Sequence, residues 1–299
     1  MIGSALAEAE ARLAAAGIEF ARRDARLLLA LALDRPADEL ARVDAHLSEH
    51  QAIRLRSLVE RRAAREPYAF IAGHREFWSL DFEVGPGVLV PRPETETLIE
   101  ELDRTLKDQR QCRLAIGDFG TGSGCLLIAA LTEFPQATGV GLDNSTEALR
   151  WARKNVEKHC LFDRVTLRHQ DWTNEMPDQF DVILSNPPYI RHRDVMALAP
   201  EVARYEPPSA LDGGGDGLAA FRSLAPRIAQ ALKPDGVALL EVGADQYEDV
   251  RDVLQNSGLK VERIVKDLAG IGRCVVARPG PQAGTLRTEK TVGKSGLTR

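Results

Sequence analysis

The stretch Leu114-Ala-Ile-Gly-Asp118-Phe-Gly120-Thr-Gly122-Ser-Gly124-Cys-Leu-Leu-Ile-Ala-Ala-Leu131 decides the fold. Its apolar start predicts a short buried strand, and the apolar run after Gly124 predicts a helix packed on a sheet. Glycines at every second position between them let the backbone turn sharply and let a ligand approach the main chain. Backbone N–H groups at the helix start then face that ligand. The pattern therefore predicts an α/β protein with a ligand-binding turn.

The spacing of the glycines separates this turn from two common phosphate-binding loops. It lacks the Gly-Lys-Ser/Thr ending of a Walker A loop, and Gly-x-Gly-x-Gly is not the dinucleotide pattern Gly-x-Gly-x-x-Gly. A second predicted strand, 137–143, ends in Asp143. This acid lies ~20 residues after the loop, where nucleotide-binding acids accept hydrogen bonds from ribose hydroxyls. Asp143 is alternatively a helix N-cap. A ribose site without a pyrophosphate site indicates an S-adenosyl nucleoside.

Composition narrows the class of protein. The 299 residues are 44% hydrophobic and 28% charged, which is typical of a soluble globular chain with two domains. The N-terminus lacks a secretory signal pattern, so a cytoplasmic location is expected. The four cysteines lack Cys-x-x-Cys spacing and the six histidines are dispersed, so neither a metal site nor a disulfide framework is expected. A net charge of −5 disfavours bare nucleic acid as the main partner.

Residues 1–66 form the first predicted domain, a bundle of four or five helices. Asp34-Arg-Pro36 ends one helix, and Ser48-Glu-His-Gln51 is a capping box that opens another. The segment contains eleven arginines, no lysine and eleven acidic residues. A balanced surface of this kind favours either a protein-recognition module or a stabilising cap on the second domain.

Residues 67–93 predict a β-hairpin linker. Strand-like alternation covers 77–84, and Gly85-Pro-Gly87 is a turn signal. The next predicted unit, 94–278, begins with a helix running to about Lys107. The charged side chains just before and within its first turn, Arg92, Glu94 and Glu96, either form a solvated helix start or contact a bound ligand.

A third predicted strand, 165–169, is followed by Asp171 and Trp172. An acid and an aromatic residue at this position can hydrogen-bond the amino group of an adenine and stack on its ring. The alternative is a turn acid beside a core tryptophan. Ligands of open α/β sheets bind at the carboxyl ends of the strands, where the glycine loop and both acids are predicted to lie.

The fourth predicted strand runs directly into Asn186-Pro187-Pro188-Tyr189. The prolines remove two N–H donors, so the main chain there offers carbonyl oxygens, and Asn186 adds a side-chain carbonyl. Two nearby acceptors suit a planar NH₂ group, whose nitrogen they can hold and aim at an electrophilic methyl group. Tyr189 is predicted to pack against the planar substrate.

Together these motifs resemble those of class I S-adenosylmethionine-dependent methyltransferases that act on planar nitrogens. The segments 91–96 and 206–217 resemble, more specifically, the HemK/PrmC-type glutamine methyltransferases of peptide chain release factors. The resemblance covers residues 1–278. It implies a Rossmann-like sheet with helices on both faces, which agrees with a closing antiparallel pair predicted at 260–266 and 273–278.

By this resemblance the chain transfers a methyl group from S-adenosylmethionine to the glutamine of the Gly-Gly-Gln loop in class 1 release factors. The products are N5-methylglutamine and S-adenosylhomocysteine. The residues implied to hold the cofactor are Gly120, Thr121, Gly122, Ser123, Gly124, Asp143, Asp171, Trp172 and Asn186. Those implied to bind or orient the substrate amide are Asn186, Pro187, Pro188 and Tyr189. The segment Glu241-Val-Gly243 departs from the family pattern and is expected to touch no catalytic atom.

Three other functions are compatible with the same core motifs. They are adenine-N6 methylation of nucleic acid, methylation of a ribosomal-protein glutamine, and a non-catalytic binding module. The first needs a basic face for a flipped base, and the last predicts a damaged loop or a lost Asn186. The release factor is therefore the expected partner, with a monomeric enzyme and no membrane.

The remaining segments carry structural predictions. Residues 191–205 are expected to be either a mobile segment over the site or a plain surface loop. The glycine-dense segment 212–217 is expected to be a turn that caps the helix after it. A fifth strand is predicted at 237–242 and a helix at 246–257. From 279 onward the chain offers no core residues, so 279–299 are expected to be a disordered tail.

Overall fold

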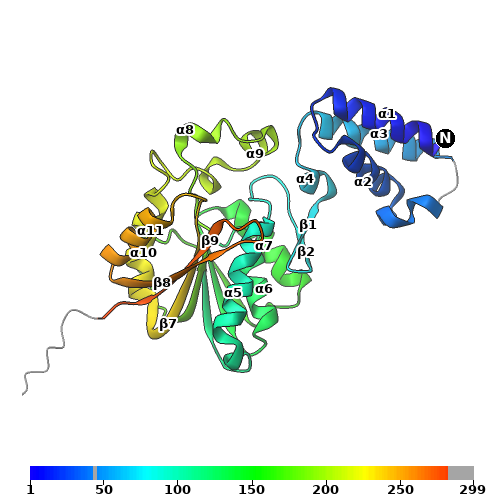
Figure 1. The fold of residues 1–299 in the computed structure, drawn as a ribbon. Helices are drawn as coiled ribbons and strands as arrows, with labels where there is room; N and C mark the ends of the chain where they lie inside the picture. The colour runs from blue at the N-terminus through cyan, green and yellow to red at the C-terminus, as the bar shows by residue number, and fades with distance from the viewer. Residues whose placement is uncertain (43–45, 282–299) are drawn as a thin grey trace, which may run out of the picture.

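A computed structural model describes residues 1–42 and 46–281. Its centre is a seven-stranded sheet in the order β5-β4-β3-β6-β7-β9-β8 (Figure 1). The strands are β3 (Ala115–Phe119), β4 (Thr138–Asp143), β5 (Val165–His169), β6 (Phe180–Ser185), β7 (Leu232–Glu241), β8 (Leu259–Lys266) and β9 (Gly272–Pro279). β3 to β7 pair in parallel, and β9 pairs antiparallel with both β7 and β8. The predicted Rossmann-like sheet and its closing antiparallel pair are confirmed.

Helices cover both faces of this sheet, each over its own apolar core. One core takes residues from α5 (Glu96–Leu106), α6 (Cys125–Glu133) and α7 (Thr146–Lys158). The other takes residues from α10 (Ala219–Ala231) and α11 (Tyr247–Asn256). The strand order reverses at β3, since β4 lies on one side of it and β6 on the other. Such a reversal leaves a crevice at the carboxyl ends of the strands.

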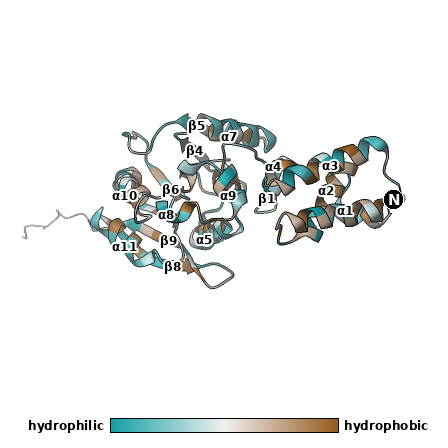
Figure 2. Cartoon of the chain, turned by 90° about the horizontal axis from the view of Figure 1, so that it is seen from above, coloured by the Kyte–Doolittle hydropathy of each residue, from teal (hydrophilic) through white to brown (hydrophobic). Residues whose placement is uncertain are grey.

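The N-terminal helices lie at one end of the molecule in both views (Figures 1 and 2). They are α1 (Ile2–Ala15), α2 (Ala21–Leu33) and α3 (Glu49–Ala63). The described part of residues 1–66 holds these three and a 3₁₀ helix, η1 (Ala37–Arg42), so its four helices match the lower number of the predicted four or five. The capping box is confirmed, because Ser48 Oγ accepts from Gln51 N and Gln51 Oε1 from Ser48 N. Asp34 ends α2 in the left-handed region, at φ 50°.

The linker differs from the predicted hairpin. Residues 68–72 form a short helix, α4, and the hairpin consists of β1 (His74–Phe77) and β2 (Leu80–Glu83). Its turn is Trp78-Ser79, both at positive φ. Contacts with the sheet domain hold this turn, since Trp78 N donates to Glu96 and Trp78 Nε1 donates to Glu133. The turn signal Gly85-Pro-Gly87 does mark a turn, at Pro86-Gly87, but this turn follows β2 and does not join the two strands. Gly85 also leaves room for Trp151, whose ring lies 2.5 Å from where a Cβ would be.

Two short helices replace the segment expected to lack regular structure. α8 (His192–Val195) and α9 (Pro200–Tyr205) follow β6, and a 3₁₀ turn, η4 (Pro208–Ala210), comes next. Two further 3₁₀ turns, η2 (Pro93–Thr95) and η3 (Lys107–Gln109), flank α5. β9 reaches Pro279, and the predicted tail from residue 282 onward lies outside the described residues. Among described residues no helix has the length and apolar character needed to cross a membrane.

Candidate active site at the carboxyl ends of the parallel strands

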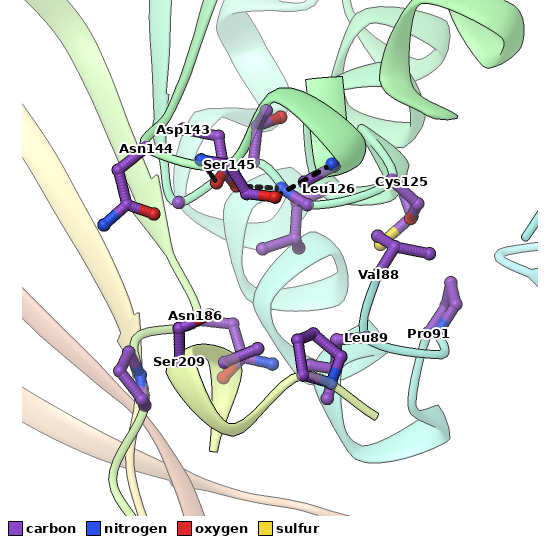
Figure 3. Close-up of a pocket in the computed structure, with 18 of the residues that line it drawn as sticks. Val88, Leu89, Pro91, Cys125, Leu126, Asp143, Asn144, Ser145, Asn186 and Ser209 are labelled. Carbon is purple, nitrogen blue, oxygen red and sulfur yellow. Dashed lines mark hydrogen bonds between the residues drawn. The ribbon is translucent and has the colours of Figure 1, made fainter. Parts of the chain in front are cut away.

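A cavity lies at the switch point of the sheet. Its lining comes from loops that follow β3, β4, β5 and β6, together with residues 87–95 and η4. Asp143, Asn144 and Ser145 lie on one side of it, and Asn186 and Ser209 lie on the opposite side (Figure 3). The sequence-predicted residues that line it are Gly120, Thr121, Gly122, Ser123, Asp143, Trp172, Asn186 and Pro188.

The glycine loop is held by the neighbouring strand. Gly120, Gly122 and Gly124 all have positive φ, at 80°, 56° and 81°, which favours glycine over residues with a side chain. The N–H groups of Gly120 and Thr121 both donate to Leu142 O, at 2.9 and 2.8 Å. A Cβ on Gly120 would lie 3.1 Å from the Trp172 ring. The loop therefore presents bare backbone to the cavity.

Asp143 connects the loop to the next helix. Its Oδ2 accepts from Gly122 N and its Oδ1 accepts from Ser145 N, both at 2.9 Å. Burial raises the pKa of this carboxyl, and the backbone N–H groups partly oppose that rise. The helix N-cap is Ser145, whose side chain accepts from Ala148 N. Asp143 thus braces the loop while lining the cavity, where its remaining acceptor capacity suits hydroxyl groups.

Asp118 is a buried acid beneath the same loop. Its Oδ2 accepts from Thr121 Oγ1 at 2.7 Å, whereas Oδ1 has no hydrogen-bond partner among the described residues. Burial raises the pKa of this carboxyl to about 7. A cation bound nearby would favour the ionised form. A bare glycine loop, a ribose acid and an under-satisfied buried acid fit S-adenosylmethionine, which carries a nucleoside and positive charge.

Of the two residues predicted to contact the adenine, only Trp172 lines the cavity. Trp172 lines it and donates from Nε1 to Ser223 Oγ at 3.0 Å. Asp171 is not among the lining residues, and its Oδ1 accepts from the backbone and hydroxyl of Thr173. The geometry of Asp171 is that of a turn acid.

Asn186 is positioned where β6 ends beside β3. Ser185 Oγ donates to Phe119 O at 2.6 Å, which fixes the strand ends to each other. Asn186 Nδ2 donates to Thr95 Oγ1 at 3.1 Å. A second cavity adjoins the first and is lined by Asn186, Pro187 and Tyr189. Asn186 therefore lies on the boundary between the two cavities.

The backbone of the Asn-Pro-Pro-Tyr segment is packed against the glycine-dense segment. A Cβ on Gly213 would lie 2.8 Å from Tyr189 Cα, and one on Gly217 would lie 2.5 Å from Tyr189 O. Gly213 N also donates to Ile190 O at 2.8 Å. These glycines support the site by close approach, a role that the sequence reading as a simple turn missed.

The three charged residues left open by the sequence have different positions. Arg92 lines both cavities and pairs with the buried Glu206 at 2.6 Å. Glu94 lines the second cavity. Glu96 accepts from Trp78 N and so holds the hairpin.

Glu241 belongs to the site, which corrects the expectation that its segment touches no catalytic atom. Tyr189 Oη donates to Glu241 Oε1 at 2.9 Å, and Thr95 Oγ1 donates to Oε2 at 2.5 Å. Glu241 is 1% exposed and lines the second cavity. Burial raises the pKa of both Glu241 and Tyr189. The only sequence signal was an acid at the end of a predicted inner strand, where parallel strands place site residues.

Two families match different parts of the chain. Residues 4–73 match the PrmC N-terminal domain, and residues 93–217 match the Methyltransferase small domain.

Relatives match over nearly the whole chain. The release factor glutamine methyltransferase of Rhodospirillum rubrum is 42% identical over 279 residues, which are 93% of this chain and 85% of the relative. The protein of that name from Caulobacter vibrioides is 42% identical over 276 residues, 91% of this chain and 94% of the relative. A solved methyltransferase from Pyrococcus furiosus is 20% identical with a TM-score of 0.48, covering 68% of this chain and 90% of that chain.

Proposed function

The chain belongs to the family of release factor glutamine methyltransferases, and from that premise we propose how its two cavities perform the reaction. The methyl donor is S-adenosylmethionine, and the acceptor is the side-chain amide nitrogen of the glutamine in the Gly-Gly-Gln loop of a class 1 release factor. The products are N5-methylglutamine and S-adenosylhomocysteine. The observation that carries this proposal is the place of Asn186, on the boundary between the two cavities.

The first cavity holds the cofactor. The loop 120–124 would face the methionine part through residues 120–123, which line the cavity, Asp143 would accept from the ribose hydroxyls, and Trp172 would pack against the adenine. Asp171 contributes at most through its turn beside Trp172. Asp118 supplies negative charge beneath the loop when it is ionised. When bound, S-adenosylmethionine supplies an electrophilic methyl carbon on a positively charged sulfur.

The second cavity holds the glutamine side chain. Asn186 Oδ1 and the Pro187 carbonyl each accept one hydrogen of the amide NH₂ group, Tyr189 shapes the wall beside it, and Pro188 lines the adjoining first cavity. Accepting both hydrogens raises the electron density on the nitrogen and holds it in an orientation that faces the methyl carbon. Bound S-adenosylmethionine would supply the methyl group, and its S–C bond would break with the electron pair left on sulfur as the amide nitrogen took the methyl carbon. The methylated nitrogen is then strongly acidic and loses one proton to water.

The N-terminal helices lie beyond the second cavity and are assigned to recognition of the release factor. α9 connects them to the site, since Tyr205 Oη donates to Ala64 O at 2.7 Å. We assign the chain to the cytoplasm, as a monomer acting on a protein rather than directly on nucleic acid. The net charge of −5 agrees with a protein substrate.

The test is a labelled methyl-transfer assay with purified class 1 release factor, a ribosomal protein and DNA side by side. Label is expected on the release factor alone, at the glutamine of Gly-Gly-Gln as located by mass spectrometry. A release factor with that glutamine changed to glutamate is the matched control and is expected to stay unlabelled. Label on DNA or the ribosomal protein, with none on the release factor, would refute the proposal.

A further inference from the structure

A series of three hydrogen bonds connects side chains that line the two cavities, with Thr95 on the first, Tyr189 and Glu241 on the second, and Asn186 on both. It connects Tyr189 to Glu241, Glu241 to Thr95, and Thr95 to Asn186, at 2.9, 2.5 and 3.1 Å. Its members come from the end of β6, the end of β7 and the turn η2. Thr95 and Glu241 are 2% and 1% exposed, so water does not compete for these bonds.

In this series of hydrogen bonds the donor and acceptor of each bond are fixed. An ionised carboxylate only accepts hydrogen bonds, and both oxygens of Glu241 receive a hydroxyl proton. Thr95 has a single hydroxyl proton, which goes to Glu241, so toward Asn186 its oxygen can only accept. Asn186 must then present Nδ2 to Thr95. An inverted amide would place Oδ1 against a hydroxyl oxygen with no proton left to share.

The direction matters because of what Asn186 faces. With Nδ2 held by Thr95, Oδ1 is left for the substrate, whose NH₂ group has two hydrogens to donate. An inverted Asn186 would place its own NH₂ group against the NH₂ group of the substrate, so that two donors would face each other. We propose that Thr95 and Glu241 are positioning residues, which act through Asn186 to keep its oxygen toward the carboxamide nitrogen of the substrate. This inference rests on the proposed function and adds to it two residues that touch no reacting atom.

The buried charge supports this assignment. A buried carboxylate is costly unless it is hydrogen-bonded, and apolar residues often fill such space at lower cost. Glu241 is offset by Arg273, which lines the same cavity, and opposed by Glu94. Its other titratable neighbours are Tyr189, Cys125 and Cys274. Burial raises the Glu241 pKa. Protonation of Glu241 at low pH would add a donor to the series, so the donor and acceptor of each hydrogen bond would no longer be fixed.

The first test replaces Thr95 by valine, which keeps the shape and removes the hydroxyl. Thr95→Val is expected to lower kcat for release factor methylation about tenfold, the value of one hydrogen bond. The Kd for S-adenosylmethionine by calorimetry is expected to stay within about twofold. Thr95→Ser restores the hydroxyl and should recover most of kcat. Thr97→Val, at a second buried threonine two residues on, is the matched control and should keep wild-type kcat.

The second test separates positioning from packing. In an Asn186→Ala background, Thr95→Val should cause no further loss of the residual rate, because its effect passes through Asn186. The kcat of the wild-type enzyme is expected to fall at acidic pH as Glu241 becomes protonated, and Glu241→Gln should remove that fall from the pH profile. A kcat for Thr95→Val within about twofold of wild type, or an equal loss in both backgrounds, would overturn the inference. A wild-type enzyme that labels no release factor would instead refute the proposed function.

Discussion

Arg62 on α3 and Glu201 on α9 form an ion pair, with Nη1 2.9 Å from Oε1. Their side chains are 10% and 17% exposed. Arg62 also donates to the buried Asp24 at 2.8 Å, and Arg65 donates to Glu201 at 2.7 Å. The N-terminal helices are thereby connected to the segment that follows Asn-Pro-Pro-Tyr, so the orientation of the bundle is coupled to the wall of the second cavity.

Removing the charge of Glu201 should therefore impair use of the release factor more than use of the cofactor. Glu201→Gln is expected to raise KM for the release factor roughly fivefold, about 1 kcal/mol. It should lower the free energy of unfolding by about 1–2 kcal/mol, because hydrogen bonds to a charged group are lost. Steady-state kinetics and urea denaturation measure the two effects. Glu147→Gln, on the exposed face of α7, is the control, and equal effects of both changes would argue against the coupling.

Asn186→Ala should leave binding largely intact and remove transfer. Without Oδ1 the amide nitrogen is no longer aimed, and misplacement of a reacting group costs on the order of 10²-fold in rate. The Kd for S-adenosylmethionine by calorimetry should change by less than about threefold. Asn174→Ala, at an exposed position, is the control. Turnover by Asn186→Ala comparable to wild type would remove this residue from the mechanism.

Asp143→Ala should weaken cofactor binding and largely preserve methyl transfer, which is the reverse of the effect expected for Asn186→Ala. The change removes a carboxylate that braces Gly122 and lines the first cavity, so the Kd for S-adenosylmethionine should rise roughly 10- to 100-fold. At saturating cofactor the kcat should recover toward wild type. If calorimetry gave an unchanged Kd, Asp143 would be only the brace of the loop.

Asp118 predicts a pH dependence of cofactor binding. Its pKa is about 7, and positive charge in the cavity favours the ionised form. Binding then releases a proton, so affinity should rise with pH and level off above that pKa, by at most roughly tenfold per pH unit below it. Calorimetry between about pH 6 and 8 measures this rise, which Asp118→Asn should flatten. Asp216→Asn is the control, since the Arg222 hydrogen bond holds the pKa of Asp216 at about 2. A steep rise that persists in Asp118→Asn would assign the titration to another group.

The sequence predicted the parts of the site that follow strands. A glycine loop and an acid at successive strand ends must meet at one edge of a parallel sheet, and Asp143 and Gly122 do so. Asn186 follows the same rule. These placements need only the strand periodicity and the order of motifs along the chain.

The parts that were missed depend on contacts between distant segments. Thr95 and Glu241 are 146 residues apart, and no local pattern indicates that the Thr95 hydroxyl donates to the Glu241 carboxylate. The hairpin turn at Trp78-Ser79 uses two non-glycine residues at positive φ, which tertiary hydrogen bonds stabilise. Gly85 and Gly213 were interpreted only as parts of turns, and they also accommodate Trp151 and the Tyr189 backbone. Local turn propensity does not indicate whether another segment packs closely against a glycine.

The most direct test of the account is a crystal structure of the chain with S-adenosylhomocysteine and a release factor bearing an intact Gly-Gly-Gln loop. The glutamine nitrogen is expected within hydrogen-bond distance of both Asn186 Oδ1 and the Pro187 carbonyl, with its free side toward the cofactor sulfur. Thr95 Oγ1 is expected to remain hydrogen-bonded to Asn186 Nδ2. A glutamine side chain bound away from Asn186, or an adenosyl group outside the cavity of Gly120 and Asp143, would contradict it.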